Sequence, residues 1–457
     1  MGFTTKDFGP DFKWGVSTAA YQIEGASTLD GKGASIWDVF ANTKGKTYQN
    51  QHANTSCDFY HHYAQDIALM SIMNIPNFRF SISWSRIMPE GTGKVNYKGI
   101  DFYNKVIDFC LQLGIEPWIT LYHWDLPYEL EKKGGWANRE IVNWFSDYVH
   151  ACITAFGSRV KHWMVLNEPV VFTGAGYFLG IHAPGRKGLN SFLAATHHAA
   201  LCKAEGGRIL RSMRSDLCIG TTFNASYIQP YSMSKQDELA AKRVDALVNK
   251  LFVEPLVGLG YPVKDLPLLQ RLEQFVKSGD EQRLAFDMDF IGVQNYTREI
   301  VAASLYKPLI WATVVKANKR GVETTLMNWE VYPECIYHVL HRFNSYKPKA
   351  LVVTENGAAY EDVVIGGEVA DTKRKQYLED HISQVARAKK EGINVTGYFV
   401  WSFTDNFEWA EGYRPRFGLV HVNFETQQRI VKQSGKWYSK LITETALVHL
   451  ADAERYA

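Results

Sequence analysis

Strand-length apolar segments alternate with helix-length amphipathic segments along this chain, and the alternation limits the folds that it can adopt. The predicted strands are residues 13–18, 77–81, 116–122, 162–167, 218–223, 290–295, 350–355 and 395–401. Apolar residues at spacings of three and four define helical faces between them: Phe102, Tyr103, Val106, Ile107, Cys110 and Leu111 in one, and Tyr377, Leu378, Ile382, Val385 and Ala386 in another. Nearly continuous apolar strands joined by helices predict a parallel sheet that is covered on both faces.

Eight such units follow one another without a linker, a low-complexity tract or a short repeat. This pattern favours a (β/α)8 barrel over an open doubly wound sheet. A dinucleotide-binding sheet would also need a Gly-x-Gly-x-x-Gly turn after its first strand, and the chain has none there. At 457 residues the chain exceeds an average domain, but single barrels commonly do so. We therefore expect residues 1–457 to form one TIM-barrel domain with extended loops after its strands.

The charge balance bears on the binding partners of the chain, and the cysteines bear on its cellular compartment. Lys and Arg number 50 against 48 Asp and Glu, so the chain lacks the basic surplus that a nucleic-acid surface requires. The six cysteines are widely spaced and form no Cys-x-x-Cys pattern, which indicates free thiols in a reducing compartment. The sequence shows neither a membrane-length apolar run nor the apolar segment of a secretory signal. We expect a cytoplasmic protein without nucleic-acid or membrane partners.

Polar and aromatic residues gather where the predicted strands end. They are Gln22, Arg79, His123, Trp124, Asn167, Glu168, Gln294, Asn295, Tyr296, Glu355, Asn356 and Trp401. Barrel enzymes build their sites at the carboxyl ends of several strands at once, whereas purely structural strand ends carry ordinary turn residues. The clustering therefore predicts one polar pocket with aromatic walls at that end of the barrel.

Glu168 and Glu355 are the candidate catalytic pair. Glu168 follows the fourth strand in an Asn-Glu-Pro turn and Glu355 ends the seventh in Thr-Glu-Asn-Gly, so the two could face each other across the barrel mouth. Enzymatic hydrolysis of a glycosidic acetal uses two carboxyl groups. One protonates the leaving oxygen, and the other acts at the oxocarbenium-like carbon. Turn formation would explain either glutamate alone. Their matched positions favour the catalytic interpretation.

Arg79 and His123 are further candidates, each with a structural alternative. Arg79 lies between two phenylalanines in a strand, and a buried guanidinium needs an acidic partner. That pair could be part of the scaffold, or it could keep a catalytic carboxylate ionised. A lone histidine at a position such as that of His123 is usually a hydrogen-bonded core residue. The spacing of His, Cys, Asp and Glu predicts no metal site.

The segment from Trp401 to Trp409 places two indoles around polar side chains. Sugars stack their C–H faces on aromatic rings, while their hydroxyls bond to bidentate acceptors. An aromatic core cluster is the alternative, but it would not need Asp405, Asn406 and Glu408 among its members. The segment is therefore typical of a sugar-binding wall.

Together these residues resemble glycoside hydrolase family 1, the β-glucosidase family, from about residue 8 to residue 442. The matching segments are FKWGVSTAAYQIEGA at 12–26, Asn-Glu-Pro at 167–169, Thr-Glu-Asn-Gly at 354–357 and Asn-Phe-Glu-Trp at 406–409. By this resemblance Glu168 corresponds to the general acid/base and Glu355 to the nucleophile of a retaining enzyme, while Arg79 and Tyr296 hold the nucleophile. The implied substrate-binding residues are Gln22, His123, Asn167 and Glu408 for the sugar hydroxyls, Trp124, Trp401 and Trp409 around the sugar, Trp329 as the aglycone platform, Phe417 on the floor, and Gln294.

The chain departs from the family pattern at two positions. It has Gln294-Asn295-Tyr296 where the family usually has Asn-Tyr-Tyr, so the first amide is one methylene longer while Tyr296 keeps its place. Asn328 replaces a common glycine beside Trp329, and we expect it to stiffen the aglycone loop.

The resemblance implies a retaining β-glucosidase without a cofactor, which releases terminal β-D-glucosyl residues from oligosaccharides such as cellobiose or from aryl and alkyl glycosides. A transglycosylase, a 6-phosphoglycosidase, a thioglucosidase and a non-catalytic sugar-binding protein are the alternatives. The charge of Glu408 disfavours a phosphorylated sugar, and a thioglucosidase of this family typically lacks the acid that Glu168 supplies. A binding protein would not need both glutamates. The expected partner is a small β-glycoside, and either a monomer or a homo-oligomer fits the sequence.

Overall fold

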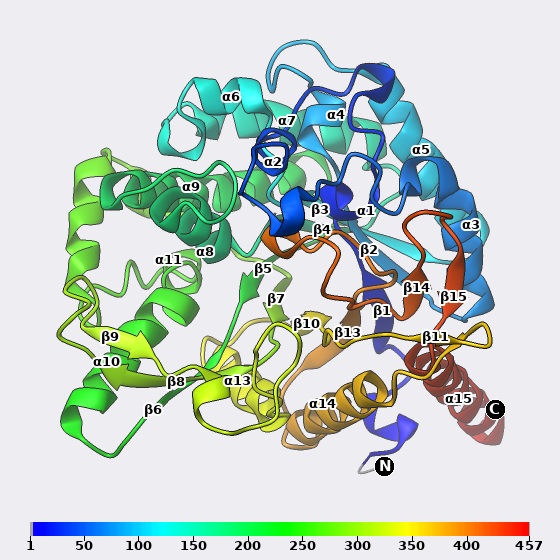
Figure 1. Ribbon diagram of the computed structural model, residues 1–457. Helices are drawn as coiled ribbons and strands as arrows, with labels where there is room; N and C mark the ends of the chain where they lie inside the picture. Colours follow the sequence, from blue (N-terminus) through cyan, green and yellow to red (C-terminus); the bar gives the residue numbers. More distant parts are fainter. Residues whose placement is uncertain (1–2, 457) are drawn as a thin grey trace.

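The centre of the computed structural model, which describes residues 3–456, is a closed barrel of eight parallel strands (Figure 1). The barrel strands are β1 (Lys13–Ser17), β2 (Asn77–Ser81), β3 (Glu116–Tyr122), β4 (His162–Asn167), β5 (Cys218–Asn224), β7 (Phe290–Gln294), β10 (Leu351–Asn356) and β13 (Val395–Trp401). They are adjacent in that order, and β13 pairs with β1 to close the barrel. The prediction of a TIM barrel is confirmed. Residues 1, 2 and 457 of the predicted domain lie outside the described residues.

Every predicted barrel strand is present, with boundaries within one residue of those expected. Strands β2, β4, β7 and β10 are buried along their whole length. Strands of a parallel sheet that is covered on both faces have no solvent side, so they appear in the sequence as apolar runs rather than as alternating patterns. That burial is why the strands were predictable.

Helices connect the strands and surround the barrel (Figure 1). The longer ones are α3 (Phe59–Ile72), α5 (Tyr97–Gln112), α7 (Ile141–Phe156), α9 (Leu189–Met213), α10 (Lys235–Asp245), α13 (Glu334–Asn344), α14 (Thr372–Lys390) and α15 (Gln433–Tyr456). The shorter ones are α1 (Ala20–Ile23), α2 (Ile36–Ala41), α4 (Trp84–Ile87), α6 (Tyr128–Lys132), α8 (Pro169–Val171), α11 (Val253–Leu256) and α12 (Asp280–Leu284). Within residues 3–456, no helix has the length and apolar character needed to cross a membrane.

The two helical faces predicted from the sequence are buried, with one exception. All five predicted residues of α14 are buried, as are those of α5 from Phe102 to Cys110. Leu111 is instead 41% exposed. Each residue turns an α-helix by about 100°, which places Leu111 beyond the edge of the buried stripe. Its assignment to that face was wrong.

Aromatic side chains fill the barrel interior below the carboxyl ends of the strands. Trp118, Met164, Phe290, Val352 and Phe399 form a core cluster separate from the main one. The ring centroids of Trp118 and Phe399 lie 4.9 Å apart although β3 and β13 are not neighbours, so this contact crosses the barrel. Glycines in the strands make the packing possible, since a Cβ on Gly220 would overlap the ring of Phe290. The interior is therefore a packed floor rather than a channel.

Three small sheets lie outside the barrel, in the extended loops. One contains β6 (Tyr227–Pro230), β8 (Arg298–Ala303) and β9 (Ala312–Val314), and the others pair β11 (Val364–Ile365) with β12 (Glu368–Val369) and β14 (Val420–Val422) with β15 (Arg429–Val431). The three-stranded sheet borders the mouth of the barrel, because Ser226 directly precedes β6 and Thr297 directly precedes β8.

Lys203 on α9 is fully buried. Its Nζ donates a hydrogen bond to the carbonyl of Phe252 and lies 5.3 Å from the ring centroid of Phe223. No carboxylate of the described residues lies within ion-pair distance of it. Burial lowers the pKa of Lys203 to about 7, because removal from water penalises the charged form.

We expect Lys203→Met to increase the free energy of unfolding at pH 6 by about 1–4 kcal/mol, because an apolar side chain replaces a buried charge. The pKa of Lys203 is lower in the folded than in the unfolded state. Above about pH 7 the unfolded chain therefore binds a proton that the folded chain has lost, and wild-type stability rises with pH. The gain from the variant should accordingly shrink between pH 7 and pH 10 in urea titrations. The exposed Lys235→Met is the control, and a pH-independent gain would contradict this explanation.

Candidate active site

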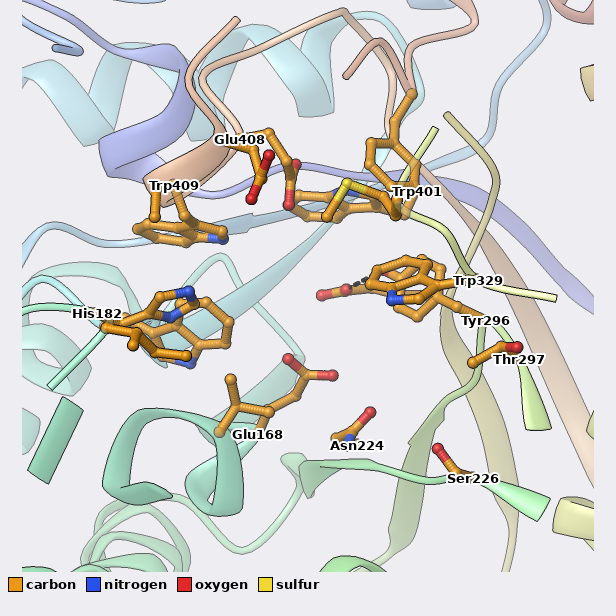
Figure 2. Close-up of a pocket in the computed structure, with 18 of the residues that line it drawn as sticks. Glu168, His182, Asn224, Ser226, Tyr296, Thr297, Trp329, Trp401, Glu408 and Trp409 are labelled. Atoms are coloured by element: carbon orange, nitrogen blue, oxygen red, sulfur yellow. Dashed lines mark hydrogen bonds between the residues drawn. The ribbon is translucent and has the colours of Figure 1, made fainter. Parts of the chain in front are cut away.

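A cavity of about 410 Å³ opens at the carboxyl ends of the barrel strands (Figure 2). Most residues predicted for the site line it: His123, Trp124, Glu168, Tyr296, Trp329, Glu355, Trp401, Glu408, Trp409 and Phe417. The others, Gln22, Arg79, Asn167 and Gln294, are fully buried behind this lining and hydrogen-bond to it or to one another. The predicted site residues therefore lie together.

Glu355, on β10, is held by three side chains. Arg79 Nη1 and Gln294 Nε2 donate to Oε1 at 2.5 and 2.6 Å, and the Tyr296 hydroxyl donates to Oε2 at 2.6 Å. Burial raises the pKa of Glu355, while the charge of Arg79 and the hydrogen bonds of Tyr296 and Arg79 counteract that rise. The ion pair of Arg79 thus lies within the site rather than in a remote part of the scaffold.

Glu168 directly follows β4 and has a left-handed backbone conformation, with φ at 44°. Pro169 begins the short helix α8 immediately after it. The Glu168 carboxyl group makes no hydrogen bond to another described residue. Burial raises its pKa well above the ordinary value, and the negative charge of Glu355 reinforces the rise, although Arg79 opposes it.

The two carboxyl groups therefore have different surroundings. Glu355 has a cation and hydrogen-bond donors as partners, whereas Glu168 has neither within hydrogen-bond distance. Repulsion between two buried carboxylates favours a state in which only one of them is ionised. These surroundings favour the state in which Glu168 carries the proton and Glu355 is ionised.

Asn167 connects the Glu355 cluster to His123. Its Oδ1 accepts hydrogen bonds from Arg79 Nη2, Gln294 Nε2 and Thr222 Oγ1, which fixes the orientation of the amide. Its Nδ2 consequently faces His123 Nε2 at 3.0 Å. The imidazole accepts at Nε2 and carries its proton on Nδ1, which has no partner among the described residues. Burial and the charge of Arg79 keep the pKa of His123 well below its usual range, so the neutral ring offers one N–H donor.

Two groups of polar side chains, which we call the polar corners, border the cavity. His123 with Asn167 forms the first, and Gln22 with Glu408 forms the second. Gln22 lies in α1 rather than at the end of β1, and its Nε2 donates to Asn406 Oδ1, to the carbonyl of Phe407 and to Glu408 Oε2 at 3.0–3.3 Å. Its Oε1 is buried without a partner among the described residues. Burial and the charge of Glu355 raise the pKa of Glu408 to about 8. Both side chains therefore offer acceptors to the hydroxyl groups of a ligand.

Two aromatic groups border the cavity from opposite sides (Figure 2). On one side Trp124 and Trp409 pack with their ring centroids 4.6 Å apart. On the other side Trp329 lies 5.1 Å from Tyr296 and 6.2 Å from Phe417. The rings leave a slot with apolar walls and polar corners, which is the form expected of a site for a flat polyol.

Further left-handed residues lie beside this slot. They are Trp124, Asn328 and Trp409, with φ of 78°, 57° and 50°. Strained backbone of this kind persists only where surrounding structure holds it, and it is frequent at functional sites. Asn328 also accounts for the departure from glycine, because asparagine adopts this conformation more readily than most side chains. Asn328 therefore fits the left-handed backbone of the turn before Trp329.

Two strand-end residues expected in the pocket lie outside it. Asn295 Nδ2 donates to the carbonyls of Ala225 and Thr297, and Asn356 Nδ2 donates to the carbonyl of Asn295. Successive side chains of a strand point to opposite faces. Since Tyr296 and Glu355 line the cavity, the asparagines beside them must point away from it. The expectation for these two was wrong.

Ten further residues that line the cavity were not predicted from the sequence. They are Val171, Ile181, His182, Asn224, Ser226, Thr297, Glu299, Met327, Ala410 and Glu411. Asn224 ends β5, one residue beyond the predicted strand, so the strand-end argument would have included it with that boundary. The others lie in loops, in the short helices α8 and η9 (Trp409–Glu411) or in the three-stranded sheet, and they carry no periodic signal.

One acidic group elsewhere has the spacing of metal ligands within the described residues. Atoms of Asp362, Asp405 and His421 all lie within 4.8 Å of one another. Lys432 Nζ lies 2.5 Å from both carboxylates, and Arg416 lies 2.7 Å from Asp405. These cations already neutralise the acids, so we interpret the group as an ion-pair network. Asp405 therefore supports the loop that carries Glu408 and does not line the cavity.

The chain matches known proteins over nearly its whole length. The family model described as Glycosyl hydrolase family 1 matches residues 4–446. The chain is 43% identical to the 1,4-beta-D-glucan glucohydrolase of Thermotoga neapolitana over 447 residues, and 42% identical to Beta-glucosidase A of Thermotoga maritima over 445 residues. Each alignment covers 97% of this chain and 99% of the relative.

Solved structures of related enzymes are similar to this chain over nearly its whole length. The family 1 β-glucosidase of Thermotoga maritima superimposes with a TM-score of 0.93 at 41% identity, covering 96% of this chain and 98% of that one. A β-glucosidase from the same organism in complex with deoxynojirimycin gives a TM-score of 0.90 at 40% identity, covering 96% and 99%.

Proposed function

Because this chain belongs to glycosyl hydrolase family 1, we propose that it is a retaining β-glucosidase that removes terminal β-D-glucosyl residues from oligosaccharides or from aryl and alkyl glucosides. The observation that carries the proposal is the asymmetry of the buried carboxyl pair. Glu355 is ionised and held by Arg79, Gln294 and Tyr296, whereas the raised pKa of Glu168 keeps its proton in place. Acetal cleavage by double displacement requires one group of each kind.

In the first step Glu168 transfers its proton to the glycosidic oxygen while a carboxylate oxygen of Glu355 attacks C1. The C1–oxygen bond breaks, the aglycone leaves as an alcohol, and the glucosyl residue becomes an ester of Glu355. Esterification removes the negative charge that helped to raise the pKa of Glu168. Glu168, now a carboxylate, takes a proton from water as the water oxygen attacks C1 and Glu355 leaves. A sugar in place of water would give transglycosylation.

The polar corners are proposed to bind the glucosyl hydroxyls. Gln22 Oε1 acts as an acceptor, and the Nδ1–H of His123 acts as a donor whose tautomer Asn167 fixes. The raised pKa of Glu408 favours its protonated form, so this carboxyl group offers a donor as well as an acceptor. Trp401 and Trp409 provide the apolar face against the sugar ring, and Trp329 lies on the side of the leaving group. Buried groups left unpaired in this way favour a ligand that satisfies them over an isostere that lacks a hydroxyl.

We further propose that the chain acts as one catalytic domain, without a cofactor, in the cytoplasm. All six cysteines are free, and all but Cys218 are buried. Free thiols of this kind suit a reducing compartment. The proposed reaction moves protons and a glycosyl group only, and the two glutamates supply both functions.

Hydrolysis of a panel of nitrophenyl glycosides tests this proposal. The panel contains the β-glucoside, β-galactoside, β-fucoside, 6-phospho-β-glucoside and β-thioglucoside, with cellobiose as a natural linkage. We expect the β-glucoside and cellobiose to be hydrolysed, and proton NMR to detect β-glucose as the first product. If α-glucose appeared first, the retaining mechanism would be excluded. Absence of turnover on the whole panel would favour a non-catalytic sugar-binding protein.

Glu408→Ser should reduce kcat/KM for the β-glucoside more than for the β-fucoside, which lacks the 6-hydroxyl. The expected difference is about 1–3 kcal/mol, the cost of leaving a buried hydroxyl group without its hydrogen-bond partner. Initial rates on the two nitrophenyl substrates measure it. Glu411→Ser is the matched control, because it removes a neighbouring charge that also lines the cavity and should affect both substrates alike. Equal losses on both substrates in Glu408→Ser would show that Glu408 is structural.

A further inference from the structure

A second and larger cavity, of about 710 Å³, adjoins the active-site cavity. We call it the apolar chamber. Its walls come from the segment that follows Glu168, from α9 and η6 (Ala246–Lys250), and from the 266–269 and 306–314 segments. Representative lining residues are Val171, Phe178, Phe192, Leu247, Leu269 and Leu309. This volume lies within the range of binding sites for small organic molecules.

The apolar chamber and the active-site cavity share wall residues. Val171 and Asn224 line both. Val171 lies three residues after Glu168, and Figure 2 shows Asn224 beside Glu168, on the side of the cavity opposite Glu408. The proton of Glu168 must reach the glycosidic oxygen, so the first atoms of the leaving group lie next to this shared wall. A leaving group directed toward Asn224 and Val171 therefore points toward the chamber.

The two cavities differ in chemical character. Five glutamates line the active-site cavity, among them Glu299 and Glu411. Among the described residues, none of those lining the chamber is acidic, and Lys307 is the only charged one. Apolar side chains at its edge remain exposed, including Leu179 at 51%, Leu309 at 40% and Val314 at 42%. A ligand that covered this surface would therefore be stabilised by removal of apolar area from water.

A third cavity shows where a sugar-like leaving group would fit better. It measures about 290 Å³ and shares Thr297, Glu299, Met327 and Trp329 with the active site. Polar side chains such as Asn318 and Lys316 form much of its remaining wall. The hydroxyls of a second glucosyl residue would find partners there, and they would find few in the chamber. The apolar chamber therefore suits a different class of leaving group.

We propose that the apolar chamber binds the hydrocarbon tail of the aglycone, so that the enzyme accepts β-glucosides of long-chain or otherwise largely apolar alcohols. The inference rests on the proposed β-glucosidase activity and adds to it a binding site for the apolar part of the leaving group. The glucosyl residue lies between Glu408 and Glu355, the glycosidic oxygen lies at Glu168, and the tail passes Asn224 and Val171 into the chamber. A disaccharide does not use the chamber.

A series of linear alkyl β-D-glucosides from ethyl to dodecyl, each kept below its critical micelle concentration, tests the proposal. Beyond butyl the leaving alcohols have nearly the same acidity, so kcat should stay level. We expect KM to fall about twofold to fourfold for each added methylene group until the chamber is filled. Calorimetric titration with dodecyl 1-thio-β-D-glucoside, a slowly cleaved analogue, measures binding of the tail without turnover.

Two variants of the chamber wall and one control variant test whether the alkyl tail of the substrate binds in the apolar chamber. Leu309→Asp places a charge in the chamber wall and should flatten the dependence of KM on chain length. Leu305→Asp changes the same segment at a residue that is 83% exposed and does not line the chamber, so the dependence should remain. Val248→Trp fills part of the chamber and should make KM level off at a shorter chain. The KM for cellobiose should stay within about twofold of wild type in all three.

The proposal is overturned if KM does not depend on chain length in the wild type, or if the dependence survives both chamber variants. It is also overturned if Leu309→Asp leaves that dependence intact but converts an oligomer to a monomer in sedimentation, because a second copy would then cover the chamber. If Leu309→Asp misfolds and loses cellobiose activity, the proposal is tested by the chain-length dependence of KM in Val248→Trp and by the thioglucoside titration of the wild type. A wild type that hydrolyses no β-glucoside would instead refute the proposed function.

Discussion

The variant Glu355→Ala is expected to hydrolyse β-glucosides at close to the background rate, whatever the leaving group. Without this carboxylate no covalent intermediate forms, and Arg79 and Tyr296 lose the group that they hold. The loss should exceed the factor of about 10²–10⁴ that proton transfer alone contributes. Initial rates with dinitrophenyl, nitrophenyl and alkyl β-glucosides measure it. Glu361→Ala, an exposed acid in the loop after β10, is the control and should keep wild-type rates.

Azide should restore activity to Glu355→Ala with a stereochemical signature. The anion can occupy the space of the lost carboxylate and attack C1 directly while Glu168 protonates the leaving group. One inversion converts a β-glucoside into an α-glucosyl azide. The product is identified by the coupling constant of its anomeric proton in NMR. Rescue that yields the β-azide would contradict the role of Glu355 as the nucleophile.

Glu168→Ala should hydrolyse alkyl glucosides and cellobiose about 10²–10⁴-fold more slowly than the wild type, because the leaving groups of these substrates need a proton. Dinitrophenolate needs none, so formation of the glycosyl-enzyme should survive with that substrate. No base then remains to activate water, and the intermediate should accumulate. We expect a burst of one equivalent of dinitrophenol, together with a protein mass increased by one glucosyl residue. Absence of both would indicate that Glu168 does not act in the second step.

The anomer of the glucosyl azide product distinguishes Glu168→Ala from Glu355→Ala. In Glu168→Ala it attacks the glucosyl ester of Glu355, and two successive inversions give a β-glucosyl azide. The two alanine variants should therefore yield opposite anomers from the same substrate and the same anion. If both gave the same anomer, the assignment of acid/base and nucleophile would be refuted even though both residues were essential.

The sequence predicted the parts of the site that depend on position along a strand. Glu168 and Glu355 were predictable because both stand where a buried apolar run stops. Turn formation would explain either acid alone, but it does not explain two acids at matched positions of the barrel. Gln294 was only partly predictable. The sequence shows a longer amide, but only the structure shows that its Nε2 reaches both Glu355 and Asn167, at 2.6 and 2.8 Å.

Other features depend on contacts between distant segments. Asn295 and Asn356 were placed in the pocket because the sequence shows where a strand ends more clearly than which face a side chain takes there. Glu299 lies in β8 and Ser226 directly precedes β6, in a small sheet whose strands are only partly buried and therefore lack the continuous apolar run of the barrel strands. The apolar chamber is formed by segments from residue 170 to residue 314. Each of these segments taken alone resembles an ordinary core.

The left-handed backbone at Glu168 has a consequence for how this chain could be stabilised. An ordinary side chain in that conformation costs about 1–3 kcal/mol, and the folded barrel must offset this cost to present the carboxyl group at the right place. A glycine would relieve the cost and remove the acid. Selection for heat resistance alone would therefore tend to discard the residue on which turnover depends, and the most durable form of this barrel would not be the most active one.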